Sequence, residues 1–140
     1  MSNKKGYTLI EILVVLVIIG TLAALAWPNY MAIKEKTLNR EARANLALIR
    51  AAEKIYRMEQ GYYYPHAAAT SVVSDINSFL KLSLPESATV SWSIEVDSTG
   101  APEFAEATRT GTGADGRVWK INFPGDVEPV CTEGTGDNCP

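Results

Sequence analysis

The sequence has few of the residues that enzymes commonly use for catalysis. It contains one histidine, His66, beside Pro65, and only two cysteines. It has no HExxH pair, no phosphate-binding glycine loop and no nucleophile elbow. These absences argue against a metalloprotease, a P-loop nucleotide-binding protein and an α/β-hydrolase. We therefore expect a protein that is not an enzyme.

Positive charge is also scarce. The 140 residues carry 13 Lys and Arg against 16 Asp and Glu, which gives a net charge of -3. This balance provides no general attraction to nucleic-acid phosphates, so we expect no nucleic-acid partner. A local exception is the group of basic residues at Arg109, Arg117 and Lys120.

What the sequence does have is one long apolar run near its start. Residues 7–27 are almost wholly hydrophobic, and as an α-helix they would be about 31 Å long, which matches the hydrocarbon core of a bilayer. Lys4 and Lys5 precede the run, so the positive-inside rule predicts a cytoplasmic N-terminus with the rest of the chain across the membrane. Gly6 follows the lysines at once, an order that differs from a secretory signal peptide, whose cleavage site follows the apolar run.

One carboxylate, Glu11, stands inside this run, where an ionised side chain at mid-bilayer costs about 2.5 to 3.5 kcal/mol. A local explanation exists, because Thr8 and Glu11 have the spacing of a capping box in which the glutamate returns to the backbone N–H of Thr8. Glu11 also lies only about 6 Å along the helix from Tyr7, close to the membrane interface. The residues alone leave open whether Glu11 serves this cap or another purpose.

The stretch Gly6-Tyr7-Thr8-Leu9-Ile10-Glu11, with a short basic leader before it and an apolar helix after it, resembles the class III signal of type IV pilins and pseudopilins. The resemblance implies cleavage after Gly6 by a prepilin peptidase and N-methylation of the new first residue, Tyr7. It also implies that Glu11 pairs with the terminal amine of a neighbouring subunit. The family usually has phenylalanine where Tyr7 stands, a departure that bears on processing and methylation.

Gly20 and Pro28 interrupt the helical pattern. Proline removes a backbone hydrogen bond, and glycine weakens a helix by about 1 kcal/mol relative to alanine. From the residues alone, Pro28 marks a helix end followed by a second helix, and Gly20 marks close packing against another membrane helix. The resemblance implies a different role, since some family members unwind between a glycine and a proline at this spacing in the filament.

An amphipathic helical pattern follows in residues 29–61. Gly61 is a natural helix stop, and Pro65 opposes continuation. We expect one face of the helix to be covered and the charged positions, Glu53 among them, to be solvated. The apolar residues that recur at spacings of three and four are Leu38, Ala42, Leu46, Ile49, Ala52 and Tyr56.

Beyond Gly61 the hydrophobic pattern alternates, as in strands. Residues 90–96 and 118–123 are strand candidates, residues 102–109 are a weaker third, and residues 78–84 are a short helix or an extended piece. The sequence therefore predicts an α+β fold, in which a small antiparallel sheet packs on the amphipathic half of one long helix, as in pilins. The expected organisation is a cleaved leader at 1–6, a membrane and assembly helix at 7–28, its amphipathic continuation at 29–61 and a β-rich head at 62–140.

The two cysteines, Cys131 and Cys139, lie close together near the C-terminus. A disulfide between them, outside the cytosol, would stabilise the fold by about 2.5 kcal/mol in the chain-entropy model, and the resemblance implies such a bond. We expect no cofactor. Calcium is an alternative, because the resemblance to major pseudopilins implies a calcium site in this region. The carboxylates available to it are Asp115, Asp126, Glu128, Glu133 and Asp137.

The resemblance implies a filament subunit that is held in the bacterial inner membrane by a single helix before assembly. An inner-membrane assembly platform would then polymerise it with copies of itself and with minor pilins, into an extracellular pilus. Two alternatives stay open. One is a pseudopilin of a type II secretion or competence apparatus, which forms a periplasmic fibre; the cysteine pair favours the pilus over it. The other is a membrane-anchored periplasmic binding protein, in which the helix is only a tether.

Overall fold

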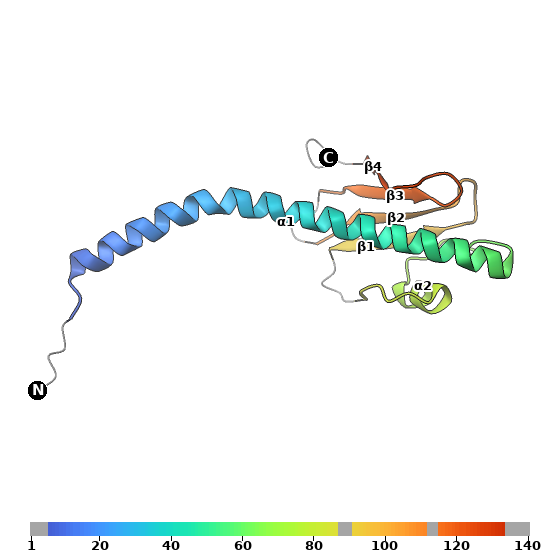
Figure 1. The fold of residues 1–140 in the computed structure, drawn as a ribbon, viewed down its shortest axis with the longest axis horizontal. Coiled ribbons are helices and arrows are strands. Elements are labelled where there is room, and N and C mark those ends of the chain that lie inside the picture. The colour runs from blue at the N-terminus through green and yellow to red at the C-terminus, as the bar shows by residue number, and fades with distance from the viewer. Residues whose placement is uncertain (1–5, 87–90, 112–114, 134–140) are drawn as a thin grey trace, which may run out of the picture. The chain divides into compact units, whose positions relative to one another are not determined.

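The computed structural model describes residues 6–86, 91–111 and 115–133 and comprises two compact units, one up to Thr37 and one from Leu38 onward. Each unit is described by itself. The elements are labelled in Figure 1 and run in the order α1 (Leu9–Gln60), α2 (Val73–Leu80), β1 (Trp92–Asp97), β2 (Phe104–Arg109), β3 (Val118–Asn122) and β4 (Val130–Glu133).

Helix α1 is continuous through both interruptions in its sequence. Pro28 lies inside the helix, and Gly20 is helical as well. The interpretation that Pro28 ends one helix before another begins is therefore wrong, because the surrounding apolar residues hold helical geometry despite one missing N–H donor. The predicted stop at Gly61 is confirmed. This glycine has a φ of 88° and donates its N–H to the carbonyl of Arg57 at 2.8 Å, the geometry of a left-handed C-terminal cap.

The second half of α1 supplies the core of the second unit. Ala42, Leu46 and Ile49 are completely buried, and Ala52 is buried as well. Leu38 and Tyr56, at the two ends of the predicted stripe, are partly buried against the same core. The period of three and four residues therefore identified the covered face correctly.

The sheet is antiparallel throughout, with the strand order β1-β2-β3-β4. In β1, buried residues such as Ile94 and Val96 alternate with residues that are exposed or half-exposed. The register places Ile94 opposite Ala107 of β2. Figure 1 shows the second half of α1 lying along this sheet, with α2 beside it. The expected α+β fold is confirmed.

The boundaries of the smaller elements were less predictable. The first two strand candidates correspond to β1 and β3, and the weaker third is β2. Only the first three residues of the piece expected at 78–84 are helical, as the end of α2, which begins at Val73 and ends at Leu80. Strand β4 was not predicted from its four residues.

A buried polar contact joins α1 to the sheet. Arg117, only 1% exposed, donates from Nη1 to Oδ1 of Asn39 at 2.9 Å and from Nε to Asp115 at 3.1 Å. The indole N–H of Trp119 points to the same Asn39 oxygen at 3.4 Å. Because a buried guanidinium is tolerated only when it is paired and hydrogen-bonded, this contact fixes where α1 crosses β3.

A pair of leucines in α1 provides a matched test of this packing. Leu46 has no exposed surface and Leu48 is 53% exposed, so we expect Leu46→Ala to lower the free energy of unfolding by about 2 to 5 kcal/mol and Leu48→Ala by less than about 1 kcal/mol. Thermal and denaturant unfolding of the full chain in mild detergent, followed by near-ultraviolet circular dichroism, measures both. Equal effects would contradict the described core.

Candidate assembly site

The first turn of α1 contains a capping box. The backbone N–H of Glu11 points to Oγ1 of Thr8 at 3.3 Å, and the backbone N–H of Thr8 points to Oε2 of Glu11 at 3.4 Å. These two contacts satisfy donors that the helix start would otherwise leave open, and the carboxylate lies at the positive end of the helix dipole. The local interpretation of Glu11 is therefore realised in the single chain. Both contacts are long, and they involve only one of the two carboxylate oxygens.

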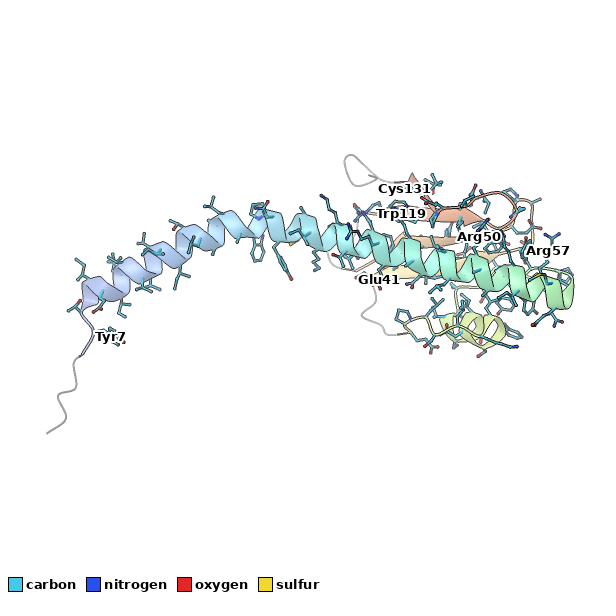
Figure 2. The ribbon with its side chains drawn as sticks, viewed as in Figure 1. Tyr7, Glu41, Arg50, Arg57, Trp119 and Cys131 are labelled. Atoms are coloured by element: carbon cyan, nitrogen blue, oxygen red, sulfur yellow. The ribbon has the colours of Figure 1, made fainter. Side chains whose placement is uncertain are left out.

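The residues around Glu11 form an apolar surface that nothing in the described chain covers. From Leu9 to Ile33 the large apolar side chains are exposed on all sides of the helix, as Figure 2 shows. The helix has an apolar window with a mean hydropathy of 2.8, which is long and apolar enough to cross a membrane. Such a surface requires lipid or other apolar helices around it.

Tyr7 and Gly6 stand just before this helix. Both are exposed, Tyr7 to 81%, so the bond between them is accessible in the described chain. Tyr7 directly precedes Thr8, the first residue of the capping box. A backbone amine at Tyr7 would therefore lie next to the first turn of α1, and the N–H of Thr8 that Glu11 caps would remain in place.

The two helix interruptions are open to contact. Apart from the two chain neighbours and the adjacent helix backbone, no described atom lies within 4 Å of a methyl group placed on Gly20, which leaves room for a close neighbour there. Thr21, beside it, returns its hydroxyl to the carbonyl of Ile18 at 2.9 Å. The helical state of this segment in the single chain does not bear on unwinding in a filament, which stays a prediction.

The basic group expected at Arg109, Arg117 and Lys120 is not a surface patch. Arg109 and Arg117 are 5% and 1% exposed, and both guanidinium groups lie over the Trp92 ring, at 5.8 and 5.9 Å from its centroid. Lys120 is half-exposed, lies over the Phe104 ring and faces Glu106 at 3.9 Å. These cations stabilise the head and do not offer a nucleic-acid surface.

Three of the carboxylates considered for calcium, Asp115, Asp126 and Glu128, form contacts with other side chains. Asp115 pairs with Arg117. Burial by itself would raise the pKa of the Asp115 carboxyl, but the hydrogen bonds and the charge of Arg117 outweigh burial and lower this pKa. Asp126 accepts hydrogen bonds from the backbone and side-chain nitrogens of Asn122 at 2.9 and 2.8 Å. Glu128 pairs with Arg43 at 3.1 Å. Among the described residues no cluster of three metal-ligating side chains occurs. Asp137 lies outside the described residues, and so does the placement of the Glu133 side chain.

The remaining predicted residues contribute no catalytic arrangement. His66 packs its ring on Tyr62, with centroids 4.5 Å apart. Cys131 lies half-buried in β4, whereas Cys139 lies outside the described residues, so the disulfide between them stays a prediction.

The prediction for a further ionisable residue, Glu53, was also wrong. Glu53 was expected on the solvated face of α1 but is completely buried, where its Oε2 accepts the backbone N–H of Tyr64 at 2.9 Å. Burial raises its pKa to about 8, opposed by that hydrogen bond. The signal was present in the sequence. Glu53 follows Leu46 by seven residues and Ile49 by four, which places it on the core-facing stripe.

Comparison with known proteins identifies the start of the chain. Residues 1–27 match the family model of the prokaryotic N-terminal methylation motif. The chain is 38% identical over 63 residues to type II secretion system core protein G of Klebsiella pneumoniae, and 40% identical over 62 residues to the protein of the same name from Escherichia coli K12. It is 39% identical over 61 residues to the type IV major pilin protein PilA of Myxococcus xanthus. No solved structure matches the chain at a significant level.

These relatives confirm the resemblance to pilins and pseudopilins. The matched regions cover 45%, 44% and 44% of this chain, and 45%, 43% and 28% of the three relatives in the same order. The chain therefore spans less than half the length of the curated relatives it matches. The relatives are named as a core protein of a secretion system and as a major pilin, and neither name states an enzyme activity.

The buried glutamate predicts a pH-dependent stability. Glu53 has a pKa of about 8 in the folded chain against 4.5 ordinarily, so the folded state holds one more proton between these pH values. The contribution of Glu53 to stability is therefore most favourable below pH 4.5 and falls as pH rises toward 8, by at most about 1.4 kcal/mol per pH unit. Glu53→Gln, which keeps an oxygen for the Tyr64 N–H, should remove this fall and be more stable than the wild type at pH 9.

Thermal unfolding of the full chain in detergent at pH 4 to 9 measures this dependence. Glu59→Gln is the control, because Glu59 is exposed on the same helix. Parallel profiles for the wild type and Glu53→Gln would show that Glu53 is ionised in the folded protein.

Proposed function

We propose that this chain is the structural subunit of a pilin-like filament, polymerised through its apolar helix. The observation that carries the proposal is the methylation motif at residues 1–27 joined to an exposed apolar helix with one carboxylate in its first turn. The sequence similarity to a type II secretion core protein and to a type IV major pilin supports the same class.

Processing creates the charge that assembly needs. A prepilin peptidase cleaves after Gly6 and methylates the new amine of Tyr7. An α-amine has a reference pKa near 8 and is mostly cationic at neutral pH, and methylation leaves that charge in place. The leader lysines, Lys4 and Lys5, stay in the cytoplasm.

Glu11 then has two roles that do not exclude one another. Its Oε2 caps the helix at the Thr8 N–H, and its second oxygen accepts the Tyr7 amine of a neighbouring copy. Because an unpaired carboxylate is costly in an apolar environment, a neighbour that brings the cation lowers the free energy of the assembled state. Pairing between copies is thereby favoured over isolated helices in the membrane.

The rest of the chain follows from this arrangement. The apolar helices bundle away from water, and the heads from residue 62 onward form the outer surface. Gly20 and Pro28 are the places where the helix unwinds under tension, and a Cys131–Cys139 disulfide secures the end of the chain. An inner-membrane platform extracts the subunits, with minor pilins among them, and the head lies outside the cytoplasm.

Two kinds of filament fit these observations. The type II secretion relatives favour a periplasmic pseudopilus, and the pilin relative favours an extracellular pilus. A membrane-anchored binding protein is the alternative from another class. It would keep its leader and use Glu11 only as a cap, so the mature N-terminus distinguishes it from a filament subunit.

The mature N-terminus should begin at Tyr7. Mass spectrometry of the protein isolated from membranes is expected to show loss of residues 1–6 and the added mass of one methyl group on Tyr7. Gly6→Ile, which places a branched side chain at the cleavage site, should leave the leader attached. An intact leader on the wild-type protein would identify the helix as a simple anchor.

Replacement of Glu11 separates charge pairing from capping. Glu11→Gln can still cap Thr8 but cannot form the ion pair, so we expect normal membrane insertion with at least a tenfold loss of sheared, pelletable fibre. Thr8→Ala removes the Oγ1 contact and keeps the carboxylate, so it should retain most of the fibre. Normal fibre from Glu11→Gln, or equal loss from both variants, would assign Glu11 to the cap alone.

A further inference from the structure

Charge divides the surface of the second unit along the length of α1. The basic residues of this half of the helix are three, four or seven positions apart, which places them on one side of it. In Figure 2, Arg50 and Arg57 lie along one edge of the helix and Glu41 along the other. We call the basic side, whose residues are Arg40, Arg43, Arg50, Lys54 and Arg57, the basic flank.

The basic flank borders the connection between β3 and β4. A pocket of about 290 Å³ places Arg40 and Arg43 against Val127 and Glu128. A second pocket, of about 510 Å³, places Lys54 and Arg57 of the flank near Phe123 and Pro124 of this connection, with Met58 and Tyr63 completing its lining. Basic side chains therefore line two open pockets on this side of α1.

Few contacts within the described chain neutralise the positive charge of the basic flank. Arg43 pairs with Glu128 at 3.1 Å, and Arg57 donates to the Tyr63 hydroxyl at 3.0 Å. Arg40, Arg50 and Lys54 form no ion pair with a described residue. Like charges three and four residues apart destabilise a helix, so the flank carries an electrostatic cost that an anionic partner would relieve.

The opposite side of α1 carries the complementary charge. Glu41 and Glu59 are 18 residues apart, five full helical turns, and so face the same way. Glu59 lines the groove between α1 and α2, in which Lys81 is the cation. Asp75 is exposed in the first turn of α2, and Glu86 accepts from Asn77 of α2 at 2.8 Å. We call these four carboxylates the acidic flank.

We propose that the basic flank of one copy docks against the acidic flank of a second copy of this chain. The two flanks lie on opposite sides of one helix, so each contact leaves one basic and one acidic flank free. Such a heterologous contact adds subunits in one direction and need not close into a ring. The proposal rests on the filament function and assigns a head-to-head contact that acts together with the pairing of Glu11.

A second copy fits the basic flank better than a nucleic acid does. The chain has a net charge of -3, and the acidic flank lies directly across the helix from the basic one. Glu128, with its side chain 75% exposed, lines the pocket beside Arg40 and Arg43 that a phosphate backbone would have to approach. A protein surface with separated carboxylates can avoid Glu128, whereas a continuous polyanion cannot.

Charge reversal with complementation tests the contact in full-length protein. One variant, Arg40→Glu with Lys54→Glu, places two carboxylates on the basic flank and removes most of its positive charge. The other, Glu41→Lys with Glu59→Lys, places two cations on the acidic flank and neutralises it. The substituted residues have no ion pair with a described residue and lie on the helix surface. Each variant alone should yield at least tenfold less pelletable fibre than the wild type. Co-expression of the two, or all four substitutions in one chain, should restore it.

The controls separate this contact from folding, net charge and the filament function itself. Glu95→Lys with Glu103→Lys gives the same charge change as the Glu41/Glu59 variant, at positions outside α1, and should leave fibre yield unchanged. Thermal unfolding should show that every variant folds. Full fibre yield from both flank variants, or loss without restoration, would overturn the docking contact while wild-type fibres still uphold the filament. Absence of wild-type fibres would instead overturn the filament function.

Nucleic acid is the other partner that this experiment tests. If the Arg40/Lys54 variant forms normal fibres but loses DNA binding that the wild type shows, the basic flank would be assigned to nucleic acid and the docking contact would be overturned.

Discussion

One helix has to satisfy two different surroundings, and the rest of the structure depends on this constraint. Helix α1 runs unbroken from Leu9 to Gln60. Its first part exposes apolar side chains on every side, whereas its second part buries one stripe against a small sheet. One continuous helix therefore has a first part that is apolar on all sides and a second part that is amphipathic.

Three ionisable side chains lie in or beside the apolar parts of the structure, and each is stabilised in a different way. Glu11 is kept at the helix start, where backbone donors and the helix dipole favour a carboxylate. Arg117 is buried in the head but is fully engaged with Asn39 and Asp115. Glu53 is buried with a single backbone donor, and its raised pKa is the physical consequence. The head therefore holds its buried arginine by pairing and its buried glutamate by protonation.

The charges left on the surface are not spread evenly around α1. In the second half of α1, cations line the pockets beside the β3–β4 connection, and Glu59 lines the pocket beside α2. A protein that only needed solubility would gain more from mixing the two signs, because opposite charges four residues apart support a helix. Separation is useful when a surface has to meet its complement on another molecule.

The sequence by itself determined the helical stretches on both sides of Pro28, the stop at Gly61, the face that the head covers and three of the four described strands, because these depend on local periodicity and on glycine chemistry. It also located Glu11 and the processing motif, which are contiguous in the chain. The structure decided that the helix continues through Pro28. Only the tertiary structure decided that Arg109 and Arg117 are buried and that Glu128 pairs with Arg43. The physical reason is that the environment of a charged side chain depends on partners far away in sequence, such as Asn39 for Arg117, and no local pattern records them.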